Sequence, residues 1–190
     1  MPRLVSTFVV LLLGSMPTWG QPSVAVRDTG ALYFENVPET PASVREALAP
    51  YLNVRSAAFA DWQPRGGLLV RTRLGETAQV FRVAEPGARR ELLTFFAEPV
   101  PFASAVGDGD TAGLLLMRDV GGSEDFQLFL QSLRTGQVRL LTDGESRHGS
   151  VAVSRSGQYA AYYSTRRNGR DWDIYRVNLL TGEEQMLIEA

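Results

Sequence analysis

The chain has 190 residues, of which 44% are hydrophobic and 21% are charged, and its formal net charge is −2. This is the composition of a globular protein, and its weak charge predicts neither nucleic acid nor an anionic membrane surface as a partner. The sequence contains no cysteine. Disulfide bonds and thiolate chemistry are therefore excluded, and the redox compartment stays open.

The first residues have the pattern of a secretory signal. Arg3 gives a positive start, residues 5–13 are largely apolar, and small residues follow up to Gly20. The apolar run is too short to span a bilayer as a mature helix. The pattern therefore predicts a signal peptide at residues 1–20, cleaved near Gly20, and a protein exported to the periplasm or the extracellular space. An uncleaved membrane anchor is the alternative interpretation.

Residues 21–56 are predicted to form an N-terminal extension with one short helix. Residues 31–34 have the composition of a short strand. A helix is expected at 41–49, because Thr40 can cap its start and a proline suits its first position. Pro50 disfavours α geometry in the residue before it, so the helix is expected to end there and to lie against the first repeat.

The stretch 151–188 has the pattern of four short strands joined by tight turns. Ser156-Gly157, Asn168-Gly169 and Thr181-Gly182 mark the turns, since glycine tolerates a positive φ. The strands are expected at 151–153, 159–164, 173–178 and 184–188. A four-stranded meander of this size is typical of one propeller blade.

Two earlier units repeat this arrangement. Phe81, Phe129 and Tyr175 are separated by 48 and 46 residues. A set of leucines has the same intervals: Leu93, Leu141 and Leu187. A period in the forties with four strands per unit predicts a propeller rather than a helical solenoid. A single irregular β-sandwich is the alternative, but it does not predict the repetition. The earlier strands are expected at 68–72, 78–83, 91–95, 102–106, 114–117, 126–130 and 138–142.

The third unit resembles a known repeat. Asp173-Ile174-Tyr175 and Thr181-Gly182 match the WD40-like repeat of TolB-type propellers and of prolyl oligopeptidase (S9) serine peptidases. That repeat has a D-G turn where Ser156-Gly157 stands here. The resemblance covers roughly residues 41–187. Its features typical of the S9 propeller lie at 51–57, 61–64, 72–80, 92–100, 118–124 and 126–129.

The resemblance implies an all-β fold, namely a partial β-propeller of about three four-stranded antiparallel blades with a short N-terminal helix. The partial propeller is expected at residues 57–190. Its blades are expected at about 57–100, 101–148 and 149–190.

The resemblance also implies a function. In the S9 family, a Ser-Asp-His triad in a C-terminal α/β-hydrolase domain performs catalysis, and the propeller filters peptide substrates. This sequence stops at Ala190, inside the propeller, and has no G-x-S-x-G motif. No catalytic, cofactor-binding or metal-binding residue is therefore carried over, no cofactor is expected, and the chain is expected to be inactive alone.

The expected role is a non-catalytic segment of an exported S9-type peptidase that gates access to a hydrolase domain. Its expected partners are that domain or the remaining blades, with peptide as the substrate of the full-length protein. Without them the chain is expected to be marginally stable or to self-associate. The alternatives are a TolB-like periplasmic propeller that binds proteins, and a truncated product without function.

Several polar residues invite a functional interpretation. The single histidine, His148, is expected in a surface loop rather than as a base or a metal ligand. Glu183-Glu184 resembles the paired glutamates with which some dipeptidyl peptidases of this family hold an amino terminus, but solvated turn residues are the preferred interpretation. Asp108 and Asp110 have calcium-loop spacing but lack the bidentate glutamate that such a loop needs.

Three arginines surround the predicted turn at Asn168-Gly169. Arg166, Arg167 and Arg170 are expected to be a solvated hairpin tip. A contact with a peptide carboxylate is the alternative interpretation.

Overall fold

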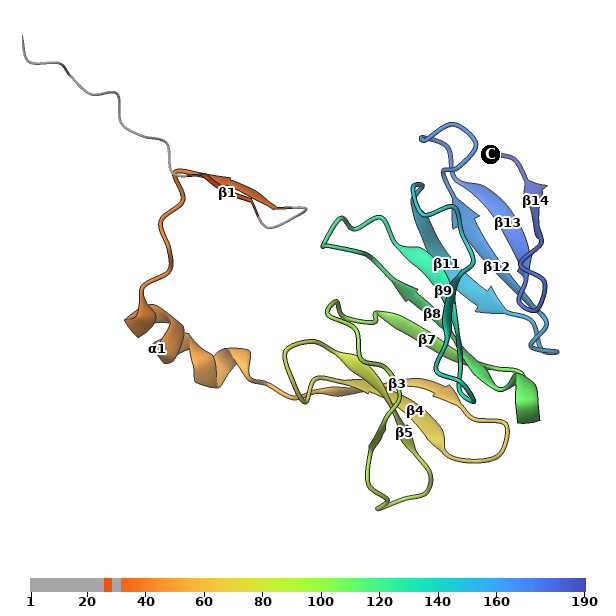
Figure 1. Ribbon diagram of the computed structural model, residues 1–190, viewed down its shortest axis with the longest axis horizontal. Coiled ribbons are helices and arrows are strands. Elements are labelled where there is room, and N and C mark those ends of the chain that lie inside the picture. The colour runs from red at the N-terminus through yellow and green to blue at the C-terminus, as the bar shows by residue number, and fades with distance from the viewer. Residues whose placement is uncertain (1–25, 29–31) are drawn as a thin grey trace, which may run out of the picture.

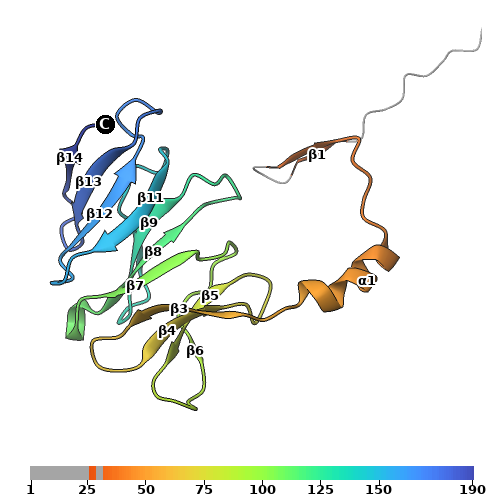
Figure 2. The same cartoon turned by 180° about the vertical axis from the view of Figure 1, so that it is seen from behind.

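The computed structural model describes residues 26–28 and 32–190, and the signal peptide predicted at 1–20 lies outside them. Within these ranges the chain forms three four-stranded antiparallel sheets, one two-stranded sheet and one α-helix. The three larger sheets stand side by side like a fan in Figures 1 and 2, following the chain from yellow to blue. No helix in the described ranges is long and apolar enough to cross a membrane.

We number the large sheets as blades 1 to 3. Blade 1 consists of β3 (Ala57–Trp62), β4 (Leu68–Thr72), β5 (Gln79–Val83) and β6 (Glu91–Leu92). Blade 2 consists of β7 (Phe102–Val106), β8 (Gly113–Arg118), β9 (Gln127–Ser132) and β10 (Val138–Leu140). Blade 3 consists of β11 (His148–Val153), β12 (Tyr159–Ser164), β13 (Asp173–Asn178) and β14 (Glu184–Ile188). In each blade the strands pair in chain order, as a meander does.

The N-terminal extension differs from its prediction. A short strand β1 (Val26–Asp28) pairs with β2 (Tyr33–Glu35), and the helix α1 (Ala42–Leu52) follows. The helix does not end before Pro50 but continues through it to Leu52. A proline in the last turn of an exposed helix removes one backbone hydrogen bond, and water can satisfy the carbonyl that loses its partner.

The start and the packing of α1 also correct the prediction. Pro41 is the N-cap, and no side chain caps the helix, so Thr40 does not have that role. The helix buries none of its residues, and in Figures 1 and 2 it leads away from the blades. The expectation that it lies against the first repeat was therefore wrong.

The repeat in the sequence is confirmed by equivalent positions in the structure. Phe81, Phe129 and Tyr175 each occupy the third position of the third strand of their blade. Their exposed fractions are 5%, 8% and 7%. The leucine set is less regular. A register shift between Ile174 and Tyr175 disturbs the pairing of β13 with β14, and Leu187 is 47% exposed.

An apolar core fills each space between neighbouring blades. Between blades 1 and 2 it includes Leu69, Val80, Leu114, Leu116 and Phe129. Between blades 2 and 3 it includes Leu115, Leu128, Tyr162, Tyr175 and Val177. Full burial of one large apolar side chain contributes about 1.5–3 kcal/mol. The faces between the blades, rather than the sheets alone, therefore hold this fold together.

Blade 1 leaves an apolar face open. Cross-strand pairing aligns Phe59, Val70, Phe81 and Leu92 in one row. Phe59 and Leu92 are 55% and 36% exposed, and Trp62, at the end of the same strand as Phe59, is 67% exposed. In the equivalent row of blade 2, Ala103, Leu116 and Phe129 are buried in the core between blades 1 and 2, and only Leu140, on the outer strand, is exposed.

Candidate functional site

A buried polar residue opens the third strand of every blade and holds the chain as it leaves that blade. These residues are Gln79, Gln127 and Asp173. Each accepts a hydrogen bond from a backbone N–H beyond the fourth strand: Phe96 at 3.1 Å, Gly144 at 3.0 Å and Ala190 at 3.0 Å. We call this contact, from the first side chain of the third strand to the backbone beyond the fourth, the clamp. It was not predicted from the sequence, although its members have the same 48- and 46-residue spacing as the aromatic markers. The clamps fix where the segments between blades run.

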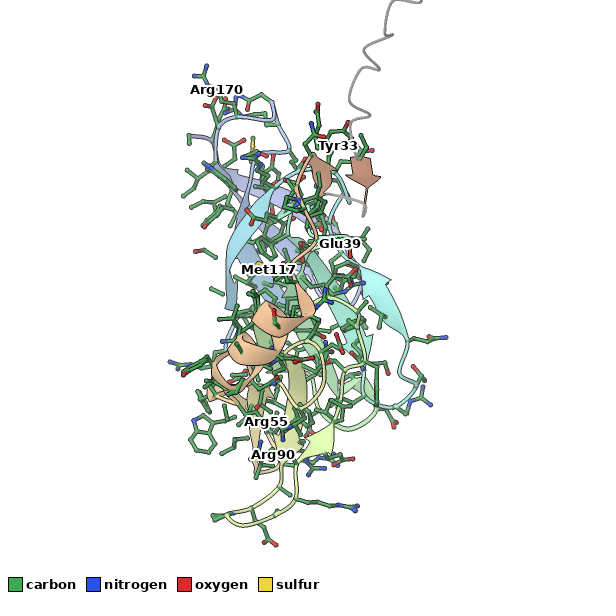
Figure 3. All side chains as sticks on the ribbon, turned by 90° about the vertical axis from the view of Figure 1, so that its left-hand side faces the viewer. Tyr33, Glu39, Arg55, Arg90, Met117 and Arg170 are labelled. Carbon is green, nitrogen blue, oxygen red and sulfur yellow. The ribbon has the colours of Figure 1, made fainter. Side chains whose placement is uncertain are left out.

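A cleft of about 470 Å³ opens around the start of β11, lined by residues of blades 2 and 3. Its walls come from the β8–β9 loop, the segment that enters β11, and the ends of β12 and the β12–β13 loop. The volume is within the range of small-molecule sites. Met117, one of the lining residues, lies in the middle of the molecule in Figure 3.

Two aromatic rings form one wall of the cleft. Tyr163 and Trp172 are 37% and 44% exposed, and their rings meet edge to face at 4.8 Å. Tyr163 lies directly over Gly149, where an added Cβ would stand 2.4 Å from the ring. A side chain at position 149 would therefore displace Tyr163, so the glycine is what allows this wall to form.

Another part of the lining is polar and contains backbone strain. Asp125 pairs with Arg147 at 3.3 Å, and Glu124 precedes this aspartate. Glu124 and Ser150 line the cleft with φ values of 62° and 43°. Non-glycine residues in this region are uncommon and tend to gather at functional sites.

His148 belongs to the wall of this cleft, and the structure contradicts its placement in a surface loop. It is the first residue of β11 and only 3% exposed. Its Nδ1 lies 3.1 Å from the carbonyl oxygen of Phe126, and its Nε2 lies 3.8 Å from Asp143 without a hydrogen-bond partner. Burial lowers the pKa of His148 below its ordinary value of 6.5, which outweighs the opposite effect of Asp143.

A polar network lies behind the histidine. Arg166 pairs with Glu184 and lies 3.9 Å from Asp143, while the hydroxyl of Tyr162 donates to Glu184. The ring of Tyr162 is 5.6 Å from that of His148. Burial and the hydrogen bond to Glu184 raise the pKa of Tyr162. Glu184 is thus not a solvated turn residue, and Arg166 is not a free loop-tip arginine.

Among the remaining residues predicted to be solvated, Arg167 contradicts its prediction, whereas Arg170 and Glu183 agree with theirs. Arg167 holds the fully buried carboxylate of Asp173 through two contacts of 2.7 and 3.1 Å, so its assignment to a solvated tip was wrong. Arg170 has a side chain that is 88% exposed and projects from the end of the molecule in Figure 3. Glu183 is exposed in the turn before β14, as predicted.

Of the two aspartates with calcium-loop spacing, Asp108 has a structural role, and Asp110 lies in the short 3₁₀ helix that follows it. Asp108 accepts from the backbone of Gly109 and caps the short 3₁₀ helix η1 (Gly109–Thr111). It also pairs with Arg65 at 2.7 Å. Residues 26–28 and 32–190 contain no group of three or more side chains that could hold a metal ion. The lining of the cleft at β11 offers aromatic rings, a carboxylate and an ion pair.

The fold defined by three successive meander blades is that of propeller-type proteins. No family model matches the chain. Dipeptidyl aminopeptidase BIII from Pseudoxanthomonas mexicana is 39% identical over 77 residues, which are 39% of this chain and 11% of that protein. The chain thus spans about a tenth of the length of this curated relative through the matched segment.

Solved structures are similar in fold. TolB from Acinetobacter baumannii gives a TM-score of 0.54 at 20% identity, over 72% of this chain and 32% of that one. A puromycin-hydrolysing peptidase from Mycobacterium tuberculosis gives 0.52 at 19% identity, over 70% of this chain and 20% of that one. Together with the local sequence match, these findings confirm the resemblance to the N-terminal propeller region of S9 peptidases.

Proposed function

We propose that this chain is a non-catalytic N-terminal propeller segment of an exported S9-type serine peptidase, where it gates the access of peptides to a hydrolase domain. The observation that carries the proposal is the 39% identity over 77 residues with a dipeptidyl aminopeptidase. The fold does not separate this function from that of a TolB-like binding protein, because TolB and a peptidase match it almost equally. The local identity favours the peptidase.

The reading frame beyond codon 190 provides the first test. The proposal predicts further blades and then a G-x-S-x-G motif in that frame. The chain of 190 residues should hydrolyse no dipeptide anilide and should resist fluorophosphonate labelling. Labelling that one Ser→Ala change abolishes would contradict this function. In the protein encoded by the whole reading frame, a substitution that weakens the contacts between blades should speed the hydrolysis of long peptides relative to short ones.

The N-terminal pattern of the sequence supports the proposed export. Mass spectrometry of secreted material should find a chain that lacks about twenty residues, as expected for a cleaved signal peptide. An intact N-terminus recovered in the membrane fraction would favour the anchor instead.

The open face of blade 1 supports the proposed need for a partner. Phe59 and Trp62 expose 55% and 67% of their surface there, and exposed apolar patches promote association. The chain alone should therefore self-associate in size exclusion with light scattering, and Trp62→Ser should reduce this. Arg170→Ser, at an exposed polar position, is the control. A monodisperse wild-type monomer with a sharp thermal transition would contradict this expectation.

A further inference from the structure

The charges around the cleft at β11 do not balance. Asp125 forms an ion pair with Arg147 at 3.3 Å, so these two residues add no net charge. Burial lowers the pKa of His148, which favours its neutral form. Glu124 is exposed and forms no ion pair within the described part of the chain. One carboxylate is therefore left over on the wall of the cleft.

The same cleft is lined by aromatic rings, which can bind a cation together with a carboxylate. Tyr163 and Trp172 keep 37% and 44% of their surface exposed while their rings are held together at 4.8 Å. The face of an indole attracts a cation more strongly than the ring of any other aromatic side chain does. Gly149 keeps this wall in place, since an added Cβ would displace Tyr163.

The backbone conformation of Glu124 indicates that a glutamate side chain at this position has a function. Its φ of 62° places a glutamate where glycine adopts the backbone conformation without strain. Such residues carry a cost in backbone strain, and they persist only where the surrounding structure holds them. Gly121 and Gly122 in the same loop adopt positive φ without this cost. The loop thus places a carboxylate, rather than a glycine, beside the cleft.

We propose that this cleft binds the positively charged group of a peptide, with the carboxylate of Glu124 as the counter-ion and Trp172 and Tyr163 as the aromatic wall. A volume of about 470 Å³ accommodates an arginine or lysine side chain with its adjoining peptide groups, or a terminal α-ammonium. The inference depends only on residues of blades 2 and 3. It holds whether or not a hydrolase domain follows.

The test is a titration of the full chain followed by the indole N–H signals in two-dimensional NMR. Acetyl-arginine methylamide should shift the Trp172 signal, which Trp172→Phe identifies. Its citrulline analogue has nearly the same shape without the charge and should bind at least about tenfold more weakly. Binding of the citrulline analogue as tight as that of the arginine compound would overturn the proposal.

Two variants of Glu124 separate binding from folding. Glu124→Gln should lower the affinity about two- to fivefold, the size expected for losing one exposed charge partner, while Glu183→Gln, at an exposed glutamate in a turn, should leave it unchanged. Glu124→Gly should lower the affinity at least as much as Glu124→Gln and should raise the melting temperature, because it relieves the positive φ. Equal loss in Glu183→Gln would show unspecific charge attraction and overturn the proposal.

The two sources of the cation are distinguished by a second compound. Glycyl-glycinamide offers a free α-ammonium and no basic side chain. Tighter binding of this compound than of acetyl-arginine methylamide assigns the cleft to peptide amino termini, and the reverse assigns it to basic side chains. Failure of both compounds to bind overturns the proposal and leaves the proposed function untouched.

Discussion

The two interfaces between blades use the same positions with different chemistry. Between blades 1 and 2, Arg118 lies 4.4 Å from the ring centres of both Phe96 and Phe129 and pairs with Glu98 at 3.2 Å. Phe129 and the Leu116 paired with it are apolar. This interface is an apolar contact covered by one arginine.

Between blades 2 and 3, two tyrosines replace these two apolar residues. Tyr162 and Tyr175 pair across β12 and β13 as Leu116 and Phe129 do across β8 and β9. Arg166 lies 5.5 Å from the ring of Tyr175, and its carboxylate partner Glu184 also accepts from Tyr162. Neighbouring blades can therefore pack through an apolar or a polar interface. The polar interface depends on all of its hydrogen-bonding and ion-pair partners being present.

The largest expected effect breaks the apolar interface. Phe129→Ala should lower the free energy of unfolding by about 3–5 kcal/mol, because it leaves a cavity under Arg118. Denaturant unfolding measures this, with Leu180→Ala as the control, since Leu180 is 76% exposed. A loss below about 1 kcal/mol would mean that the blades do not depend on this contact.

The next effect concerns the polar interface. Tyr162→Phe keeps the ring but removes the donor to Glu184, so unfolding should become easier by about 1–2 kcal/mol. A double-mutant cycle with Glu184→Gln should show coupling of about 1 kcal/mol. Additive losses would show that the hydroxyl and the carboxylate do not act together.

Acid should weaken the polar interface before the apolar one. Burial lowers the pKa of His148 below 6.5, so the unfolded chain binds this proton more readily than the folded one. Stability should fall as the pH falls from 6.5 to the lowered pKa, by up to about 1.4 kcal/mol for each unit of the shift. This is the single histidine of the chain.

Thermal unfolding of the wild type and of His148→Gln at pH 7.5 and pH 5 tests this expectation. The variant should lose less stability over that interval. Asp143 does not interfere, because hydrogen bonds from Ser146 and Glu145 outweigh its burial and keep its pKa below 3.8. Equal losses in both proteins would assign the acid sensitivity elsewhere.

The smallest effect is expected at the loop tip of blade 3. Arg170→Ala should change the free energy of unfolding by less than about 0.5 kcal/mol, as surface substitutions do. Arg167→Ala should lower the melting temperature clearly more, because it leaves the buried carboxylate of Asp173 without its bidentate partner. Equal melting temperatures of the two variants would refute this difference.

Most of the fold could be predicted because it follows from local patterns. The strand at Tyr159–Ser164 and the turns at Gly157 and Gly182 depend on residues close in sequence, and Gly157 and Gly182 do have positive φ, at 69° and 78°. The 48- and 46-residue spacing then gave the equivalence of the blades. Local strand and turn patterns and the repeat spacing can both be recognised in a single sequence.

The candidate site could not be predicted in the same way. Glu184 and Arg166 have the composition of a turn and a loop, yet they meet across 18 residues of sequence. His148 follows a polar segment, and only its pairing with Ser164 makes it part of a buried strand. Such contacts depend on which strands and loops the tertiary structure brings together, and local composition does not encode this.

The outer strands have a consequence for how molecules of this chain can meet. The fourth strands β6 and β10 have only two and three residues, and β14 carries a register shift. The first strands β3 and β11 carry such shifts as well. Short or kinked edge strands offer no continuous row of backbone donors and acceptors with which a strand of another molecule could pair. Contact between copies is therefore expected to stack sheet on sheet, which favours small compact assemblies over fibril growth.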